Sequence, residues 1–294
     1  MEFNKIITAD SLEHLKTLDE NVFDSCVTDP PYHLQSIVKR FTKGPAAKHG
    51  KDGSFTRLSK GFMGQEWDGG DIAFQKELWE QVYRTIKPGA VLLAFSATRN
   101  YHKMATAIED GGFEIFDMIN WIYGSGFPKR KNLLKPAHEP IVMARKGVNK
   151  ELNLDECRVN GDNPKKWTKP KGGFWKTDSN TKAEYVENTK GRWPANIIHD
   201  GLHEEWARYF YSAKASKKEK DGSDHPTVKP LELMKYLVRL VTPKDGLVLD
   251  LFAGTGTTGE AAILENRKYY LIEKTKKYIP VINKRLNKYN SLFI

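Results

Sequence analysis

The stretch "TDPPYH", residues 28–33, places a carboxylate, two prolines and an aromatic ring directly after the apolar residues "VFDSCV". Each proline fixes its own φ and lacks an N–H donor, and Pro30 disfavours the helical conformation at Asp29, so the turn is rigid and extended. We expect the Asp29 carboxylate and the Pro30 carbonyl to form a fixed pair of hydrogen-bond acceptors, with the Tyr32 ring as a stacking surface. The alternative is a strand-ending turn with a capping acid.

A second motif, "VLDLFAGTGTTGEAA", contains Gly254, Gly256 and Gly259 in the spacing G-x-G-x-x-G between a predicted strand and a predicted helix. Glu273 ends the next predicted strand. Glycines at such a turn let the backbone approach a ligand, and an acid at the second strand end can accept both hydroxyls of a ribose. The two features together indicate an adenosine-containing cofactor.

The acid before these glycines bears on which cofactor binds. Asp250 stands at the end of the predicted strand, where a carboxylate would oppose a pyrophosphate placed on the helix N-terminus. A carboxylate suits a cationic group, such as the amine of a methionine moiety. The motif therefore favours S-adenosylmethionine, with a nicotinamide or flavin dinucleotide as the alternative.

The charge of the chain indicates an acidic partner. Lys and Arg number 47 against 37 Asp and Glu, which gives a net charge of +10 and a pI near 9.3. The excess is local: residues 33–67 hold seven basic and two acidic side chains, and residues 124–146 hold six and one. Basic residues gathered in loops favour nucleic acid, the alternative being a lysine-rich solvated surface.

Methyl transfer to a nucleic-acid base would give the acceptor pair a chemical role. The transfer is an in-line displacement, with the nucleophile held about 3–3.5 Å from the methyl group. An exocyclic amine is a poor nucleophile, and acceptors such as Asp29 and the Pro30 carbonyl would localise its lone pair while Tyr32 stacks on the flipped base. Methylation at cytosine C5 needs a cysteine nucleophile, commonly one that follows a proline, and neither Cys26 nor Cys157 follows one.

Alternating strand and helix patterns surround these motifs. Strands are expected in "NKIITA", "VFDSCVTD", "PGAVLLAFSA", "FEIFDMINWIY", "HEPIVMARK", "DGLVLDLF" and "KYYLIE". Helices are expected in "SLEHLKTL", "DIAFQKELWEQVYRTIK", "NYHKMATAIEDGG", "HPTVKPLELMKYLVRLV", "TTGEAAILEN" and "KKYIPVINKRLNKY". The last two strands cannot make a sheet alone and must complete the N-terminal one, so residues 147–223, which lack this periodicity, interrupt an α/β domain.

Composition sets the remaining bounds. The chain has 294 residues, 39% of them hydrophobic, and no apolar run long enough for a membrane span. Two cysteines without metal-ligand spacing give neither a disulfide framework nor a metal site. We expect a cytoplasmic protein that binds no membrane and no metal.

The motifs "TDPPY", "LDLFAGTGTT" and "HPTVKPLELM", with the catalytic motif first, closely resemble the beta class of amino DNA methyltransferases. The resemblance implies an α/β fold: a Rossmann-like S-adenosylmethionine-dependent methyltransferase sheet with circularly permuted motif order and an inserted target-recognition region. It implies a catalytic half at residues 1–146, a target-recognition insertion at 147–223 and a cofactor-binding half at 224–294. "GRWPANIIHD" and "YFYSAKASKKEKD" resemble stand-alone enzymes of phages and prophages.

The resemblance also implies the site residues. Asp29 and Pro30 would bind the target amine, Pro31 would shape the turn, and Tyr32 would stack on the base. The family's cofactor positions match Asp10 near the adenine, Glu273 at the ribose, Thr227, Lys229 and Pro230 over the methionine end, and Asp250, Phe252, Ala253, Gly254, Gly256 and Thr257 along the methionine side. A helix N-cap explains Asp10 equally well.

Aspartate before Pro-Pro-Tyr is more typical of adenine-N6 enzymes, and serine of cytosine-N4 enzymes. We therefore expect methylation of adenine N6 in a specific sequence of double-stranded DNA after base flipping, with cytosine N4 as the alternative. A non-catalytic nucleic-acid-binding relative and a dinucleotide oxidoreductase are two further alternatives. A homodimer and a companion restriction endonuclease stay open.

Overall fold

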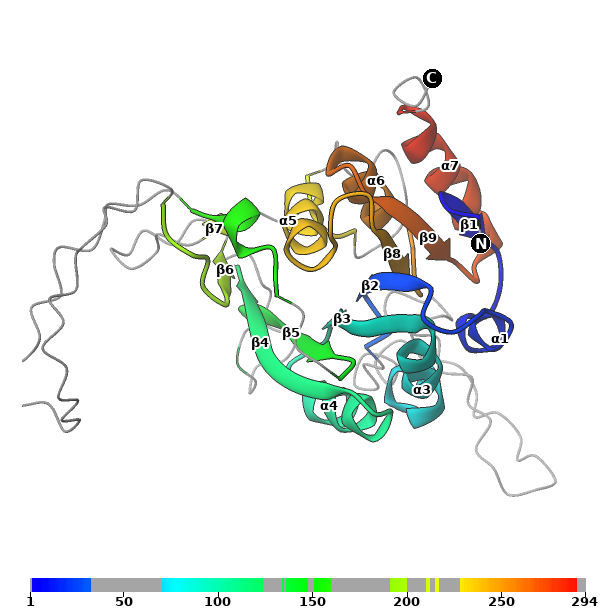
Figure 1. Cartoon of the computed structure of the whole chain (residues 1–294), viewed down its shortest axis with the longest axis horizontal. Coiled ribbons are helices and arrows are strands. Elements are labelled where there is room, and N and C mark those ends of the chain that lie inside the picture. The colour runs from blue at the N-terminus through cyan, green and yellow to red at the C-terminus, as the bar shows by residue number, and fades with distance from the viewer. Residues whose placement is uncertain are drawn as a thin grey trace, which may run out of the picture.

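The computed structural model describes residues 2–32, 70–123, 134, 136–147, 151–159, 191–199, 210–211, 215–216 and 228–289. Within these residues, nine strands form one mixed sheet in the order β1-β9-β8-β2-β3-β5-β4-β6-β7. Helices lie on both faces of the sheet (Figure 1). The predicted α/β class is confirmed.

One half of the sheet is parallel and joins the two ends of the chain. Its neighbouring strands are β1 (Lys5–Ile7), β9 (Lys268–Ile272), β8 (Leu247–Asp250), β2 (Phe23–Thr28) and β3 (Ile86–Phe95). Because β8 and β9 lie between β1 and β2, the C-terminal strands complete the N-terminal sheet, as we expected.

The other half contains a change of direction. β5 (His138–Arg145) runs antiparallel to both β3 and β4 (Glu114–Ile122), and β6 (Ile197–His199) and β7 (Phe210–Tyr211) follow parallel to β4. β6 and β7 belong to the segment in which we expected no periodic strand. They extend the main sheet and do not form a sheet of their own.

Helices cover the sheet in two groups. On one face lie α1 (Ser11–Lys16), α3 (Lys76–Thr85) and α4 (Tyr101–Asp110), and on the other α5 (Leu231–Val241), α6 (Thr257–Leu264) and α7 (Ile279–Asn287) (Figure 1). The short 3₁₀ helices are η3 (Ile72–Phe74), η4 (Leu154–Cys157) and η5 (Lys276–Tyr278). The helix expected over 71–87 is therefore divided into η3 and α3, and it ends where the backbone of Ile86 becomes extended.

Each central strand is apolar on both faces. Val27 and Leu93 belong to the core beneath α5, α6 and α7, whereas Cys26 and Leu92 belong to the core beneath α1, α3 and α4. Successive side chains of a strand point to opposite faces, so a sheet covered on both sides needs continuous apolar runs. This is why "CV" and "VLLAF" show no polar alternation.

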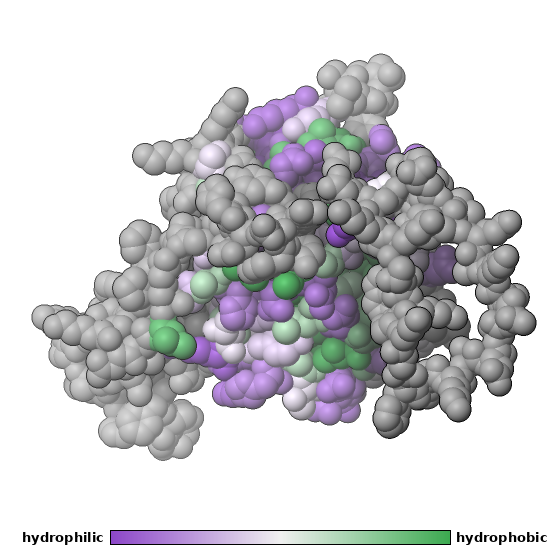
Figure 2. Space-filling view, turned by 90° about the vertical axis from the view of Figure 1, so that its left-hand side faces the viewer, coloured by the Kyte–Doolittle hydropathy of each residue, from purple (hydrophilic) through white to green (hydrophobic). Residues whose placement is uncertain are grey.

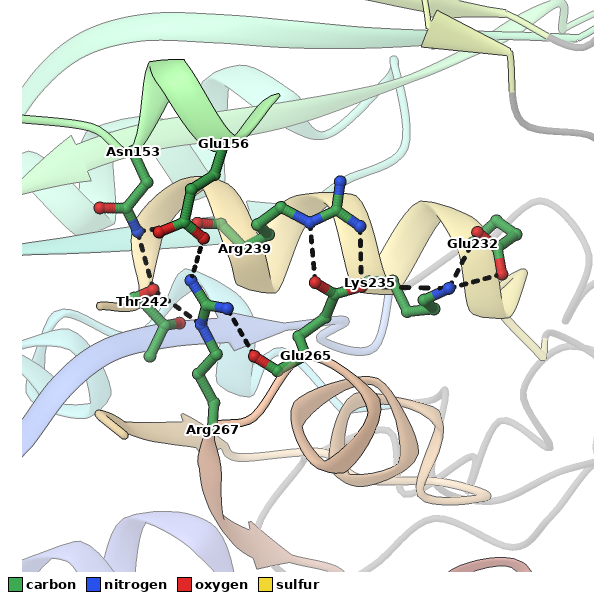
Figure 3. A network of polar contacts seen from close by, with 8 residues as sticks. All are labelled: Asn153, Glu156, Glu232, Lys235, Arg239, Thr242, Glu265 and Arg267. Atoms are coloured by element: carbon green, nitrogen blue, oxygen red, sulfur yellow. Dashed lines mark hydrogen bonds and ion pairs between the residues drawn. The ribbon is translucent and has the colours of Figure 1, made fainter. Parts of the chain in front are cut away.

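A polar network fixes the segment around η4 to the end of α5 (Figure 3). Asn153 Nδ2 donates to the carbonyl oxygens of Arg239 and Thr242, both at 2.8 Å. Arg267 Nε donates to the Thr242 carbonyl at 3.1 Å, and its Nη2 contacts Glu156 Oε2 at 2.9 Å. Residues 151–157 are thus held against the main domain through carbonyl groups that a helix end leaves without partners.

The side of the molecule that carries β4, β6 and β7 shows hydrophilic and hydrophobic residues interspersed over its described surface (Figure 2). Trp193, just before β6, is 65% exposed, with the Arg158 guanidinium 5.8 Å from its ring centroid. Among the described helices, none combines the length and the apolar character that crossing a membrane requires.

Candidate active site

The two sequence motifs meet at one edge of the sheet. Asp250 ends β8, and Asp29 follows the end of the neighbouring parallel strand β2. Thr28 Oγ1 donates to Asp250 Oδ1 at 2.9 Å, although the two residues are 222 positions apart in the sequence. The carboxyl edge of parallel strands is where open α/β sheets bind ligands, and here it brings the expected acceptor turn beside the glycine turn.

The carboxylate of Asp29 has one oxygen occupied and one open. Oδ2 contacts Lys229 Nζ at 2.6 Å. Oδ1 is buried and has no hydrogen-bond partner within the described part of the chain, a state that costs free energy in a folded protein. Burial raises the pKa of Asp29; Lys229 opposes the rise and Glu139 adds to it. Oδ1 can therefore accept a hydrogen bond from a bound ligand.

Tyr32 is fixed at both ends. Its hydroxyl donates to Glu139 Oε2 at 3.1 Å, and Lys229 Nζ donates to the same hydroxyl at 3.1 Å. Its backbone carbonyl accepts from Asn100 Nδ2 at 2.7 Å. Burial, followed by the charges of Asp29 and Glu139, holds the pKa of Tyr32 well above its usual value, so the phenol stays protonated.

Lys229 lies just before α5, with 8% of its side chain exposed. Its Nζ lies 2.6 Å from Asp29 Oδ2, 3.3 Å from Glu139 Oε2 and 4.7 Å from the ring centroid of Phe95. Burial lowers the pKa of Lys229, but the two carboxylates outweigh burial and raise it. The family resemblance led us to expect Lys229 near the methionine end of the cofactor; the structure places its ammonium on the Asp29 carboxylate.

Two residues of this cluster, Glu139 and Asn100, were not among the predicted site residues. Glu139 lies near the start of β5, beside the end of β3, because β5 runs antiparallel and Ser96 N donates to the Pro140 carbonyl at 2.9 Å. The only sequence signal was an acid immediately before Pro140 and the apolar run "IVMA". Strand direction, which periodicity does not reveal, decides that this acid reaches the site.

Asp250 organises the glycine turn. Its carboxylate accepts from Thr28 Oγ1 at 2.9 Å, Phe252 N at 3.1 Å and Thr258 Oγ1 at 2.5 Å. Burial raises the pKa of Asp250 to about 6 despite these three donors, and the charge of Asp29 contributes. Its hydrogen bonds tie the end of β8 to β2 and to the first turn of α6.

Glu273 retains free acceptor capacity. Its Oε2 accepts from Gly254 N at 2.8 Å and its Oε1 from Thr275 N at 2.6 Å. A carboxylate has about four acceptor sites, and the Thr275 side chain also bonds to Glu273, which leaves acceptor capacity for a ribose hydroxyl. The carboxylate therefore fits a ribose as a hydrogen-bond acceptor. Glu273 is 7% exposed, with a pKa that burial raises.

The three glycines of the motif differ in what they accommodate. Gly254 and Gly256 have positive φ values of 54° and 80°, which glycine adopts without strain. A Cβ on Gly256 would lie 2.8 Å from Ile282 Cγ2, and one on Gly259 would lie 2.8 Å from Leu271 Cδ1. Gly256 and Gly259 thus permit close packing of α6 on α7 and β9.

The remaining predicted residues belong to several elements. Asp10 caps α1 by accepting from Leu12 N at 3.1 Å and Glu13 N at 3.3 Å, and its Oδ2 contacts Lys274 Nζ at 2.9 Å. Ala253 N donates to the Ile272 carbonyl at 3.0 Å. Four others are placed as follows: Pro30 and Pro31 are buried, Pro230 is the N-cap residue of α5, and Thr257 begins α6. Thr227 lies outside the described residues.

Comparison with known proteins shows relatives along nearly the whole chain. The N6/N4 methylase family, described as "DNA methylase", matches residues 23–284. The type II methyltransferase M.HindIII of Haemophilus influenzae is 27% identical over 96% of this chain and 94% of its own. The type II methyltransferase M.HpaI of Haemophilus parainfluenzae is 27% identical over 96% and 74%. These relatives are bacterial type II enzymes and do not single out the phage type.

Solved structures share the fold. The M1.HpyAVI complex with S-adenosylmethionine superimposes with a TM-score of 0.54 at 19% identity, covering 96% of this chain and 98% of the other. PvuII DNA methyltransferase, described as cytosine-N4-specific, gives 0.58 at 19% identity, covering 97% and 90%. With these similarities, the dinucleotide oxidoreductase alternative is set aside. The chain belongs to the N6/N4 amino DNA methyltransferases, which transfer a methyl group from S-adenosylmethionine to adenine N6 or cytosine N4 of DNA.

Proposed function

We propose that this protein methylates the N6 amine of adenine at a specific site in double-stranded DNA, after the base has been flipped out of the duplex. The observation that supports the proposal is the open Oδ1 of Asp29, which is buried and lacks a donor among the described residues. The preference for adenine follows from the aspartate of "DPPY", where cytosine-N4 enzymes more often carry serine.

Asp29 and Pro30 would act on the amine together. Oδ1 of Asp29 and the Pro30 carbonyl would each accept one amine hydrogen, which draws the nitrogen toward sp³ geometry and localises its lone pair. When the N–C bond has formed, one amine proton must leave, and Oδ1 is an acceptor for it. Tyr32, fixed through its hydroxyl and its carbonyl, would support the flipped base with its ring.

The cofactor would lie along the ends of β8 and β9. S-adenosylmethionine, when bound, supplies a methyl group on a sulfonium that becomes a neutral thioether as the methyl is transferred. Glu273 would accept the ribose hydroxyls, and Asp250 would place the turn and present negative charge toward the methionine amine. We expect six further residues to surround or shape this region: Pro230, Phe252, Ala253, Gly254, Gly256 and Thr257. Asp10 would lie near the adenine.

The chain order supports a circularly permuted domain. The acceptor turn follows β2, and the cofactor turn follows β8, much later in the sequence but next to it in the sheet. We assign residues 1–146 to the catalytic half, 147–223 to target recognition and 224–294 to the cofactor-binding half. β6 and the η4 segment would anchor the recognition region to the sheet.

The test is to incubate the protein with labelled S-adenosylmethionine and mixed genomic DNA, and to separate the nucleosides. We expect label in N6-methyladenine. Label in N4-methylcytosine would move the proposal to the cytosine branch of the family. Binding of cofactor and DNA without transfer to any base, at high enzyme concentration, would indicate a non-catalytic relative and overturn the proposal.

A further inference from the structure

The ammonium of Lys229 joins two carboxylates from different parts of the chain. Asp29 follows β2, Glu139 lies near the start of β5, and Lys229 precedes α5. The Nζ to carboxylate distances are 2.6 Å to Asp29 Oδ2 and 3.3 Å to Glu139 Oε2. About a fifth of each carboxylate side chain is exposed, and less of the lysine.

Electrostatics explains why the three groups occur together. Two carboxylates that share a partly buried site repel each other, and without a cation one of them takes up a proton. A buried lysine in turn needs negative partners to stay charged. The ammonium of Lys229 therefore offsets the repulsion between the Asp29 and Glu139 carboxylates.

Lys229 also determines which oxygen of Asp29 is available. Because Nζ pairs with Oδ2, turning the carboxylate out of this arrangement would break the ion pair, and Oδ1 is left without a partner among the described residues. Lys229 is itself held by Glu139, whose Oε2 accepts from the Tyr32 hydroxyl at 3.1 Å and whose Oε1 lies 3.4 Å from the Tyr123 hydroxyl. Glu139 thus supports both the acceptor, Asp29, through Lys229 and the stacking ring of Tyr32 directly.

We propose that Lys229 and Glu139 are positioning residues for methyl transfer: Lys229 holds Asp29 Oδ2 so that Oδ1 faces the target amine, and Glu139 holds Lys229 and Tyr32 in place. This inference rests on the role proposed for Asp29. It gives Lys229 a task at the acceptor rather than at the cofactor, and it gives Glu139 a task in the reaction.

The charges around Asp29 predict opposite effects for the two residues. Asp29 is faced by Lys229, Glu139, the Tyr32 hydroxyl and, through Thr28, by Asp250. Lys229 lowers the pKa of Asp29 and Glu139 raises it. Since the ionised carboxylate is the acceptor, removing the lysine charge should move the acidic limb of the pH–rate profile to higher pH, and removing the glutamate charge should move it to lower pH.

The experiment measures single-turnover methylation against pH for Lys229→Met, Lys229→Arg and Glu139→Gln. We expect Lys229→Met to lose about 10²-fold in rate at neutral pH, a loss typical of a misplaced reacting group, and to shift the acidic limb upward. Lys229→Arg, which keeps the charge, should restore the position of the limb. Glu139→Gln, which keeps an acceptor for Tyr32, should slow the reaction and shift the limb downward.

A matched control and a second readout separate positioning from other causes. Glu114→Gln removes an exposed acid that pairs with Arg145 at the far end of the same β4–β5 ladder, and it should leave the profile unchanged. Affinity for S-adenosylmethionine, measured by calorimetry, should stay within about twofold in Lys229→Met. A large loss of cofactor affinity with an unshifted limb would place Lys229 at the cofactor and overturn the inference.

The outcomes distinguish this inference from the proposed function. If the wild-type protein transfers no methyl group, the proposed function fails. If the wild type is active but the two charge removals shift the limb in the same direction or not at all, the inference alone fails. Melting temperatures identify a variant that does not fold; in that case Glu139→Gln and Lys229→Arg still decide the sign, because only a downward shift in the first and none in the second agrees with the inference.

Discussion

Asp250 illustrates how a site residue can cost stability. Its pKa in the folded state is about 6, above the ordinary value of 3.8, because burial disfavours the carboxylate. The folded protein therefore binds more protons than the unfolded chain between about pH 4 and 6, and its stability falls as pH rises through that window. Asparagine at this position would keep the acceptor for Thr28 and Phe252 and remove the buried charge, and its amide would face the Thr258 hydroxyl, which would have to turn and accept.

We predict that Asp250→Asn raises the free energy of unfolding at pH 7 by on the order of 1–3 kcal/mol and flattens its dependence on pH. The same change should weaken the binding of S-adenosylmethionine, because the charge proposed to face the methionine amine is lost. Denaturant unfolding at pH 4, 5, 6 and 7, with calorimetry for the cofactor, checks both effects. A variant that is less stable at pH 7 would contradict this account of Asp250.

At the scale of elements, the glycine turn depends on close packing as well as on backbone conformation. A Cβ at Gly256 would meet Ile282 Cγ2 at 2.8 Å, and φ there is +80°. Gly147 has a comparable φ of +66°, and among the described residues, its chain neighbours apart, no atom lies within 4 Å of the position that its Cβ would take. Substituting Gly147 and Gly256 in turn therefore separates the cost of backbone strain from the cost of overpacking.

We predict that Gly147→Ala costs about 1 kcal/mol, from backbone strain alone. Gly256→Ala should cost on the order of 2–4 kcal/mol, because overpacking adds to the strain. Urea unfolding of the two variants beside the wild type measures the difference. Equal losses would show that α7 gives way without cost and that Gly256 is needed only for its backbone conformation.

The sequence predicted most elements correctly because their apolar patterns are local. "VLDLF" and "VFDSCVTD" indicate buried strands, and the G-x-G-x-x-G spacing locates the turn between β8 and α6. It did not predict that β5 runs antiparallel, or that Glu139 and Lys229 meet at Asp29. These contacts join residues far apart in the chain, and they depend on strand direction and on the path before α5, neither of which periodicity encodes. The strand β6 was also not predicted, because its three residues, "IIH", are too few to show a clear strand pattern.

At the scale of the whole molecule, the boundaries of the proposed recognition region follow from the fold. Residues 151–157 are tied to α5, and β6 is paired with β4. A swap of all of 147–223 would therefore remove parts of the main domain. The segment to exchange is 160–190, with 151–159 and 191–199 left in place.

We predict that exchanging residues 160–190 for the corresponding segment of a relative with another site changes the DNA sequence that is methylated, while the methylated base stays the same. Single-molecule sequencing of DNA from cells that express the chimera reads both. A folded, active chimera with the original sequence preference would place target recognition elsewhere in the chain.

In the proposed mechanism, Asp29 acts on the target amine and not on the cofactor. The most direct measurement compares Asp29→Ala with the wild type and with the control Glu114→Gln, in single-turnover transfer and in the affinity for S-adenosylmethionine. We expect Asp29→Ala to bind the cofactor within about threefold of the wild type, a difference of less than about 1 kcal/mol, and to transfer no detectable methyl group to DNA. Methyl transfer by Asp29→Ala at a rate near that of the wild type would contradict it.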